Sequence, residues 1–520
     1  MRHPVALLAS LLLLGGVLSP ALAGADEPAV LVGPVPATTS GAADPRDLLA
    51  EARALLRGEP VPGAPAQRRT SRGHADRELT LVLRDLRVAL PRLGAADRRE
   101  AEALLARPTD GRADPLAQGY AAKSVRTCQG KFCVHRVRTT DDRATAAWAT
   151  TTVKVMNKVW RSQVRSLGYR APLSDAPLAR SRNGGNGKFD VYLKDLGAQG
   201  LYGYCAAEFA LNAEPRRAGG YCVLDNDFSR EEFGRDPVDT LAVTAAHEFF
   251  HAVQFGYDVR EDRWFMESTA TWMEERFADD VNDNRQYLRA SQLAAPGTPL
   301  DLFNRQGSEH YGNWTWWEHL SARYGNRLVR SVWDAARGPR HSTVALERVL
   351  AKRGGLPARY AAFAAANLTP ARSYEEGAEW PTPRLRATWR MGAGAERTDT
   401  VRLDHLTSAS YLVQPEATLG AGWRLEIAVD GPSRGAAPAA WLVVRTADDQ
   451  WRSRQVDLDR RGRGSVTVGF SPTTVRAVSL TVANASTRSR CGVDDVRWAC
   501  EGRPRDDDKA FDVRAELVQR

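Results

Sequence analysis

Apolar residues recur three and four positions apart along most of the chain up to about residue 370, and they alternate with polar residues after that point. The first spacing is typical of amphipathic helices, and the second is typical of half-buried strands. The pattern therefore predicts an α+β protein with a run of strands towards its carboxyl end.

Two helical segments are predicted before residue 115. Residues 46–58, RDLLAEARALLRG, start near Asp47 and stop at Gly58, and residues 77–111 read as a helical pair broken at Pro91 and Gly94. Stretches rich in Ala, Gly, Pro and Arg around them are typical of linkers. The segment 24–115 is therefore either a pro-region or a small support segment, and the pattern does not choose between the two.

The middle of the chain mixes helices with a few strands. A long helix is expected from residue 145 to a stop at Gly168, a strand at residues 189–193, a second strand at 221–228, and helices through 236–370. Short alternating runs then follow, such as WRLEIAVDG and AVSLTVANAS, separated by turns. This change of pattern predicts one domain over residues 116–378 and a β-sandwich domain over residues 379–520.

The amino-terminal residues predict export. Arg2 and His3 precede an apolar run at residues 5–18, and Ala-Leu-Ala at 21–23 offers a cleavage site, so residues 1–23 read as a secretory signal peptide. The run is shorter than the roughly 20 residues that span a membrane. No second long apolar run follows, so we expect a secreted protein with no transmembrane segment after signal cleavage.

Cysteine and charge content refine this picture. An even count of six cysteines in an exported chain predicts disulfides. Because the cysteines fall as three close couples, we expect Cys128–Cys133, Cys205–Cys222 and Cys491–Cys500; a thiolate metal site would need a C-x-x-C spacing that is missing. The net charge of +9 comes from scattered arginines interleaved with acidic residues, which favours a solvated surface over nucleic-acid binding.

One stretch contains most of the candidate metal-binding and catalytic residues. TAAHEFFHAVQFGYD, residues 244–258, contains the pattern H-E-x-x-H in His247, Glu248 and His251. Asp236 can cap the helix, Pro237 suits its first turn, and Gly256 can end it. The helix is apolar almost all round and is therefore expected to be buried. Two buried histidines one turn apart need a partner, which Zn²⁺ supplies, and Glu248 beside them can act as a general base. The alternative is a chance spacing in a core helix.

An open zinc site needs a third protein ligand. The metzincin pattern fails, because Gln254 and Tyr257 replace its Gly and His. Residues 262–280 predict a second helix on which Glu267 follows His251 at a distance that allows a loop between the helices. Glu267 is therefore the expected ligand.

Other polar side chains compete with Glu267 or could support it. Glu274 and Glu275 are alternative ligands in a more charged stretch, whereas Thr271 and Asp239 are candidates to hydrogen-bond a ligand histidine.

Four segments together resemble a family of exported bacterial zinc metalloproteases of the gluzincin type. They are VTAAHEFFHAVQFGYD, WFMESTATWMEE, GKFDVYLKDLG and YCVLDNDF, and the similarity spans roughly residues 115–330. The resemblance implies a zincin-like core, with an edge strand that holds extended peptide. It assigns the zinc ligands to His247, His251 and Glu267 and the general base to Glu248. One departure is Thr271, where many gluzincins have Asp.

The sequence thus predicts a secreted zinc endopeptidase that acts on protein or peptide substrates. The alternative is a non-enzymatic extracellular binding protein that uses its β-sandwich, where cell-surface or glycan contact is also expected. His310 and Tyr311 are candidate oxyanion donors or simply core aromatics, and Tyr257 is a weaker candidate donor. The acidic clusters at 225–227 and 279–284 are either Ca²⁺ sites or solvated loops.

Overall fold

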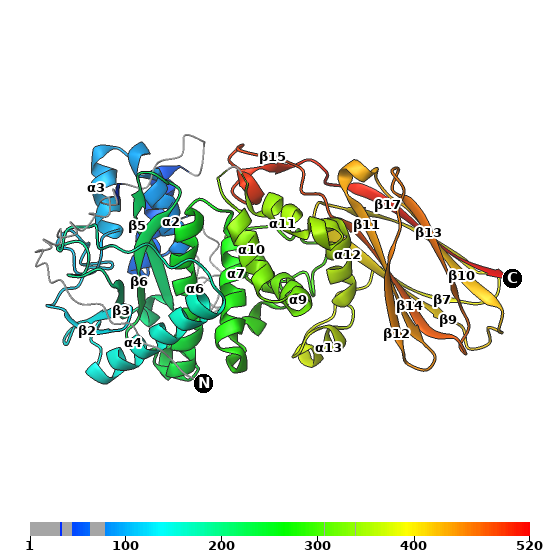
Figure 1. The fold of residues 1–520 in the computed structure, drawn as a ribbon, viewed down its shortest axis with the longest axis horizontal. Coiled ribbons are helices and arrows are strands. Elements are labelled where there is room, and N and C mark those ends of the chain that lie inside the picture. The colour runs from blue at the N-terminus through cyan, green and yellow to red at the C-terminus, as the bar shows by residue number, and fades with distance from the viewer. Residues whose placement is uncertain (1–31, 34–43, 63–78, 306, 339, 520) are drawn as a thin grey trace, which may run out of the picture.

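A computed structural model describes residues 32–33, 44–62, 79–305, 307–338 and 340–519. The predicted signal peptide lies outside these residues. The chain is elongated: a mixed sheet flanked by helices forms one end, a block of helices forms the middle, and two antiparallel-rich sheets form the other end (Figure 1). The α+β class is as predicted.

The first sheet has the strand order β1-β5-β6-β4-β3-β2. Its strands are β1 (Val32–Gly33), β2 (Val125–Gln129), β3 (Phe132–Arg136), β4 (Phe189–Lys194), β5 (Gly203–Leu211) and β6 (Ala218–Asp225). Strands β4 and β6 match the two strands expected in this region. Strands β2, β3 and β5 were not expected, and their backbones complete the sheet on both sides of that pair.

All three expected disulfides are present. Cys128–Cys133 joins β2 to β3, and Cys491–Cys500 lies near the carboxyl end. Cys205–Cys222 was expected to close a loop between two strands. Instead it joins directly opposed residues of β5 and β6, because residues 203–211 themselves form a strand.

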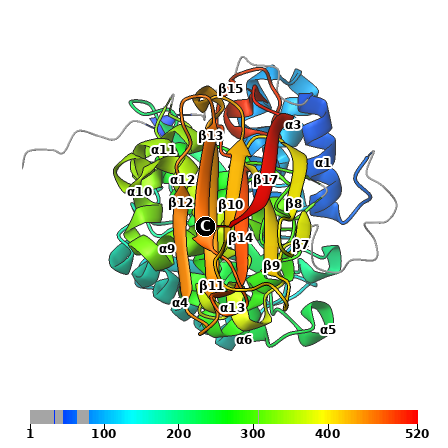
Figure 2. The same cartoon turned by 90° about the vertical axis from the view of Figure 1, so that its right-hand side faces the viewer.

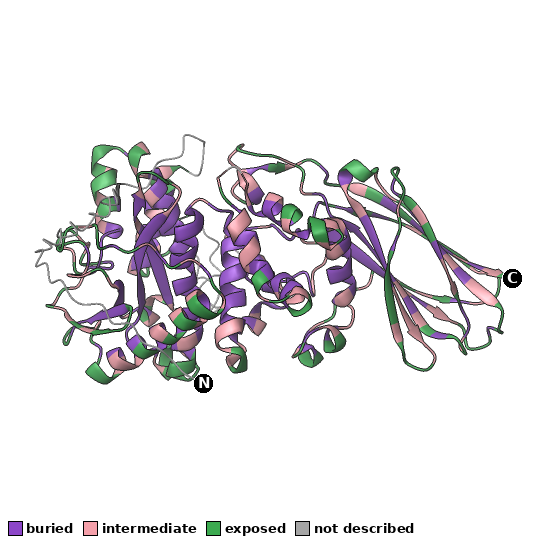
Figure 3. Cartoon of the chain, in the orientation of Figure 1, coloured by how far each residue is buried: buried purple, intermediate pink, exposed green. Residues whose placement is uncertain are grey.

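Helices cover both faces of this sheet. One face packs against α4 (Ala146–Trp160) and α6 (Pro237–Asp258), and the other packs against α1 (Pro45–Arg57) and α3 (Ala95–Leu104). Helix α2 (Leu79–Ala89) lies beside β5 and contributes residues to the cores on both faces. Strands β3, β4, β5 and β6 and most of α6 are buried, whereas β2 is half-buried to exposed (Figure 3). The long helix expected before Gly168 is α4, which continues as a π-helical turn over Arg161–Ser166.

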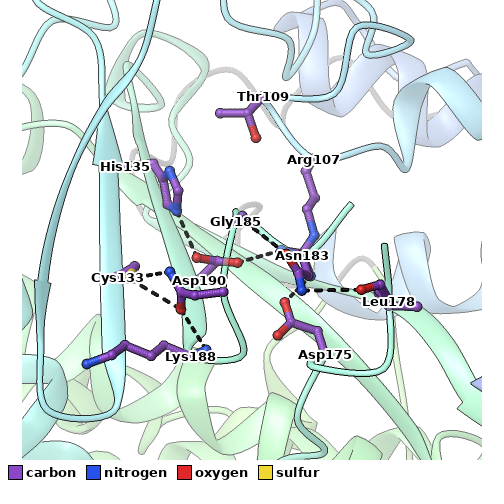
Figure 4. A network of polar contacts seen from close by, with 12 residues as sticks. Arg107, Thr109, Cys133, His135, Asp175, Leu178, Asn183, Gly185, Lys188 and Asp190 are labelled. Atoms are coloured by element: carbon purple, nitrogen blue, oxygen red, sulfur yellow. Dashed lines mark hydrogen bonds and ion pairs between the residues drawn. The ribbon is translucent and has the colours of Figure 1, made fainter. Parts of the chain in front are cut away.

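A buried polar network fixes the segment after α3 to the sheet. The Arg107 guanidinium donates to the carboxylates of Asp175, Asp190 and Glu208 at 2.8, 2.5 and 2.7 Å, and His135 contacts the other oxygen of Asp190 at 2.7 Å (Figure 4). Burial raises the pKa of Asp175 to about 7, although Arg107 opposes that shift. One arginine thus balances several buried carboxylates.

The helical block follows the first sheet. It contains α7 (Arg263–Phe277), α8 (Glu309–Gly312), α9 (Trp314–Tyr324), α10 (Arg327–Ala335), α11 (Ser342–Leu350), α12 (Gly355–Ala366) and α13 (Pro370–Ser373). The short helix α5 (Arg230–Phe233) precedes α6 and contacts it. The helical block extends the hydrophobic core of the first sheet and ends where strands begin at residue 387, close to the expected boundary.

Two sheets form the carboxyl-terminal end (Figure 2). One has the order β13-β10-β17-β8 and the other β12-β11-β14-β9-β7, and residues of both sheets share one hydrophobic core. The strands are β7 (Ala387–Met391), β8 (Glu396–Leu403), β9 (Thr407–Pro415), β10 (Trp423–Asp430), β11 (Pro438–Thr446), β12 (Trp451–Val456), β13 (Arg463–Gly469), β14 (Val475–Asn484) and β17 (Lys509–Gln519), with a small separate pair β15 (Ser489–Arg490) and β16 (Arg503–Pro504).

A buried histidine ties this end to the helical block. His405 contacts Asp507 through Nδ1 at 2.6 Å and Asp301 through Nε2 at 2.8 Å. Burial disfavours the charged ring, but the two carboxylates outweigh it and raise the pKa of His405 to about 10. Within the described residues, no helix combines the length and apolarity that crossing a bilayer requires.

Candidate metal centre

Helix α6 forms as its local sequence predicts. The Asp236 side chain accepts hydrogen bonds from the backbone N–H groups of Val238 and Asp239, and Pro237 occupies the first turn. The expected end at Gly256 is wrong, because the helix continues to Asp258. His247, Glu248 and His251 therefore lie in the middle part of an unbroken, buried helix.

Helix α7 packs against α6 and brings Glu267 to the two histidines. The Glu267 carboxylate oxygens lie 3.3 Å from Nε2 of His247 and 3.6 Å from Nε2 of His251. The three side chains offer donor atoms within 4.8 Å of one another. All three residues that the sequence singled out as metal ligands thus converge on one point.

The spacing of these atoms suits a shared cation better than mutual hydrogen bonds. Two ligands about 2.05 Å from a tetrahedral zinc lie roughly 3.4 Å apart, which is close to both separations. Among the described residues, both Nε2 atoms and both Glu267 oxygens are buried without a hydrogen-bond partner. Buried polar atoms are rarely left in that state, so a donor set of two imidazoles and one carboxylate fits Zn²⁺.

Each histidine is held through its other ring nitrogen. Nδ1 of His247 lies 2.7 Å from Oε1 of Glu274, and Nδ1 of His251 lies 2.7 Å from Oε1 of Gln254. Gln254 in turn donates to the backbone carbonyl of Met266 at 2.8 Å. In each ring the proton on Nδ1 points at the oxygen of Glu274 or Gln254, and Nε2 faces Glu267.

The supporting residues differ from those expected. Thr271 donates to the backbone carbonyl of Glu267 at 3.0 Å, and Asp239 is exposed near the start of α6, so neither contacts a histidine. Glu274, considered above as an alternative ligand, is instead the partner of His247. Glu275 faces Asn284, whose amide donates to it at 2.6 Å.

Two carboxylates, Glu267 and Glu274, determine the charge state that His247 favours. Burial disfavours the charged form of His247, but Glu267 and Glu274 outweigh it and raise its pKa to about 9. His251 and His247 in turn hold the pKa of Glu267 below its usual range despite burial. The carboxylates thus stabilise positive charge at the histidine pair.

Glu248 lies beside this cluster and has a different environment. Burial raises its pKa above the usual range, although the nearby histidines and a hydrogen bond from Thr80 oppose the shift. The Thr80 hydroxyl, in α2, donates to Oε2 of Glu248 at 2.9 Å. This contact joins positions 168 residues apart, and no local pattern predicted it.

Helix α8 places two more polar side chains nearby. The Tyr311 ring lies 6.2 Å from that of His247 and 4.3 Å from that of His310, measured between centroids. Burial lowers the pKa of His310 to about 4, so its ring is neutral near pH 7. Tyr257 is engaged elsewhere, because its hydroxyl accepts a hydrogen bond from the backbone N–H of Arg170 at 3.1 Å.

The two acidic clusters have local partners. Both oxygens of Asp225 accept hydrogen bonds from backbone N–H groups, including those of Leu196 and Phe228. Asp283 lies 3.3 Å from the Arg235 guanidinium. Asp225, Asp227 and Glu232 also offer carboxylate oxygens within 4.8 Å of one another, so a Ca²⁺ site at the first cluster stays a prediction.

Comparison with protein-family models and with curated proteins found no match to this chain.

Proposed function

We propose that this protein is an exported zinc-dependent endopeptidase of the gluzincin type, with a zincin-like core. The observation that carries the proposal is the convergence of His247, His251 and Glu267 at ligand-to-ligand spacing, with unpartnered atoms facing one another. Glu248 follows His247 directly on the same buried helix. The three disulfides support export.

In this proposal the three ligand side chains hold Zn²⁺, which when bound supplies a Lewis acid that polarises a peptide carbonyl and acidifies water. Glu248 accepts a proton from the attacking water and later delivers it to the leaving amine. His310 and Tyr311 are the nearby side chains able to donate to the developing oxyanion.

The alternative, a non-enzymatic binding protein that uses its β-sandwich, draws support from one observation. His247, Glu248, His251 and Glu267 are each at most 1 % exposed, and a substrate needs access to them. A scaffold protein would need neither the unpartnered donor set nor a carboxylate at position 248.

The test is peptide hydrolysis by the purified protein and its Glu248→Gln variant. We expect one zinc per chain in both proteins and a fall in kcat/KM of about 10²- to 10⁴-fold in the variant. Glu102→Gln, an exposed carboxylate on α3, is the matched control and should behave like the wild type. A wild-type protein without zinc, or full activity in Glu248→Gln, contradicts the proposal.

A further inference from the structure

The candidate centre is closed in this structure. Because none of its four residues is more than 1 % exposed, a peptide carbonyl reaches Glu248 only after some element moves. Helix α2 contacts the side chain of the proposed base directly through Thr80. The inference below rests on the proposed function and names the element that regulates it.

Helix α2 lies along the outer edge of β5. Thr80 accepts a hydrogen bond from the backbone N–H of Cys205 at 2.9 Å while its own hydroxyl proton goes to Glu248. About two turns further along the helix, Arg87 donates to the backbone carbonyl of Ala207 at 2.9 Å and to that of Leu105 at 3.2 Å. Apolar side chains of α2 pack into the cores on both faces of the sheet, as expected for a helix at its edge.

The backbone of β5 explains why this edge needs a partner. Cys205 and Cys222 are directly opposed with Cα atoms 4.0 Å apart, the spacing of a non-hydrogen-bonded pair, so the N–H of Cys205 points away from β6. Within the described part of the chain, β1 pairs with β5 only at Ala210 and Leu211. The edge at residues 205–207 is therefore left for α2.

Those same backbone groups are what an added strand would use. An extended peptide bound by β-augmentation accepts from one edge N–H and donates to a nearby edge carbonyl. In this structure the Thr80 oxygen takes the acceptor role and the Arg87 guanidinium takes the donor role. Helix α2 thus satisfies the edge with side chains in place of a second backbone.

We propose that α2 is an intramolecular inhibitor: it occupies the peptide-binding edge of β5 and covers Glu248, and it leaves before an extended peptide binds. Substrate and α2 compete for the N–H of Cys205, the carbonyl of Ala207 and the space above Glu248. The substrate class is a polypeptide in extended conformation.

Charged contacts hold the helix in the closed position. Asp85 of α2 pairs with Arg263 of α7 at 2.8 Å, and Arg84 donates to the backbone carbonyl of Glu261 at 3.0 Å. Burial disfavours the charged form of Asp85, yet Arg263 and Arg84 outweigh it and lower its pKa to about 2. Downstream, the Arg107 network keeps the segment attached to the sheet, so that α2 can leave the edge while its tether stays bound.

The test uses the full-length protein and two variants. Each variant destabilises only the state in which α2 lies against β5. Thr80→Val keeps the side-chain volume but removes the hydroxyl, and Arg87→Met removes a contact to β5 that does not touch Glu248. When α2 is docked these changes leave buried groups unsatisfied, whereas water satisfies them when it is released. Arg53→Met is the matched control, because Arg53 pairs with Glu100 inside the amino-terminal segment.

Three quantities are measured: bound zinc, the affinity for a fluorescent peptide hydroxamate, and hydrogen exchange of the α2 amides. We expect equal zinc in all four proteins, at least about tenfold tighter hydroxamate binding in both Thr80→Val and Arg87→Met, and faster exchange of α2 in both. Arg53→Met should match the wild type.

The outcomes separate the two proposals. Equal hydroxamate affinity in zinc-loaded wild type and variants overturns the inhibitory role and makes α2 a permanent cover of the sheet edge. Unchanged hydrogen exchange of the α2 amides also overturns it, and so does a gain in hydroxamate affinity that is confined to Thr80→Val. In either case the contacts would not hold the helix over the site. Absence of zinc from every protein refutes the proposed function instead.

Discussion

The contact between His247 and Glu274 offers a sharp prediction, because the neighbouring Glu275 provides its control. Nδ1 of His247 and Oε1 of Glu274 lie 2.7 Å apart, and both side chains are 1 % exposed. Substituting Glu274→Gln keeps the shape and an acceptor oxygen but removes the charge. We expect weaker zinc binding with the fold retained.

The magnitude follows from the kind of hydrogen bond. A bond to a charged group contributes about 1.5–3 kcal/mol and a neutral one about 0.5–1.5 kcal/mol, so losing the charge costs about 1 kcal/mol. That cost corresponds to a roughly fivefold to tenfold rise in the Kd for zinc. It falls at the lower end of the about 10- to 100-fold range for removing the partner of a metal-bound histidine.

Glu275→Gln is the control because Glu275 faces Asn284 and not a histidine. Burial raises the pKa of Glu275 to about 8, so the carboxyl group is mostly protonated near pH 7 and glutamine resembles it.

The assay is competition for zinc against a chelating dye, with thermal unfolding as a check on folding. Glu275→Gln should bind zinc within about twofold of the wild type. Equal zinc affinity in wild type and Glu274→Gln, or an equal loss in both variants, would refute the reasoning.

Two further predictions concern stability. His405 has a folded-state pKa of about 10 against 6.5 when exposed, so its contribution is fully present below pH 6.5 and is lost as the pH rises through 10. Between pH 7 and 10 the free energy of unfolding of the wild type should therefore fall by up to roughly 4 kcal/mol more than that of His405→Gln. Thermal unfolding at several pH values measures both, and identical pH profiles would contradict this. Arg107→Met leaves three buried carboxylates without their cation, so urea unfolding should show a loss of about 3–5 kcal/mol, and a loss below about 1 kcal/mol would refute the role assigned to that network.

The sequence predicted those parts of the candidate centre that depend on local spacing. A four-residue step fixes His247 and His251 on one side of a helix whatever surrounds it, and the cap at Asp236 is local as well. Glu267 was predicted because a short connection limits where α7 can lie relative to α6. In each of these cases a few neighbouring residues determine the geometry.

The features that were missed depend on long-range packing. Which carboxylate of α7 reaches Nδ1 of His247 depends on how two helices cross, so Glu274 could not be separated from Glu275 by spacing alone. Thr80 reaches Glu248 only because α2 lies against the edge of β5. Strand β5 itself was missed because both of its faces are covered, so its sequence GYCAAEFAL lacks polar alternation.

The most direct test of the central claim is anomalous diffraction at the zinc absorption edge from crystals of the purified protein. The proposal predicts one strong anomalous peak about 2.0–2.2 Å from Nε2 of His247, Nε2 of His251 and a carboxylate oxygen of Glu267. Crystals grown with added zinc that show no peak at this point, or a peak coordinated by other residues, would contradict the account.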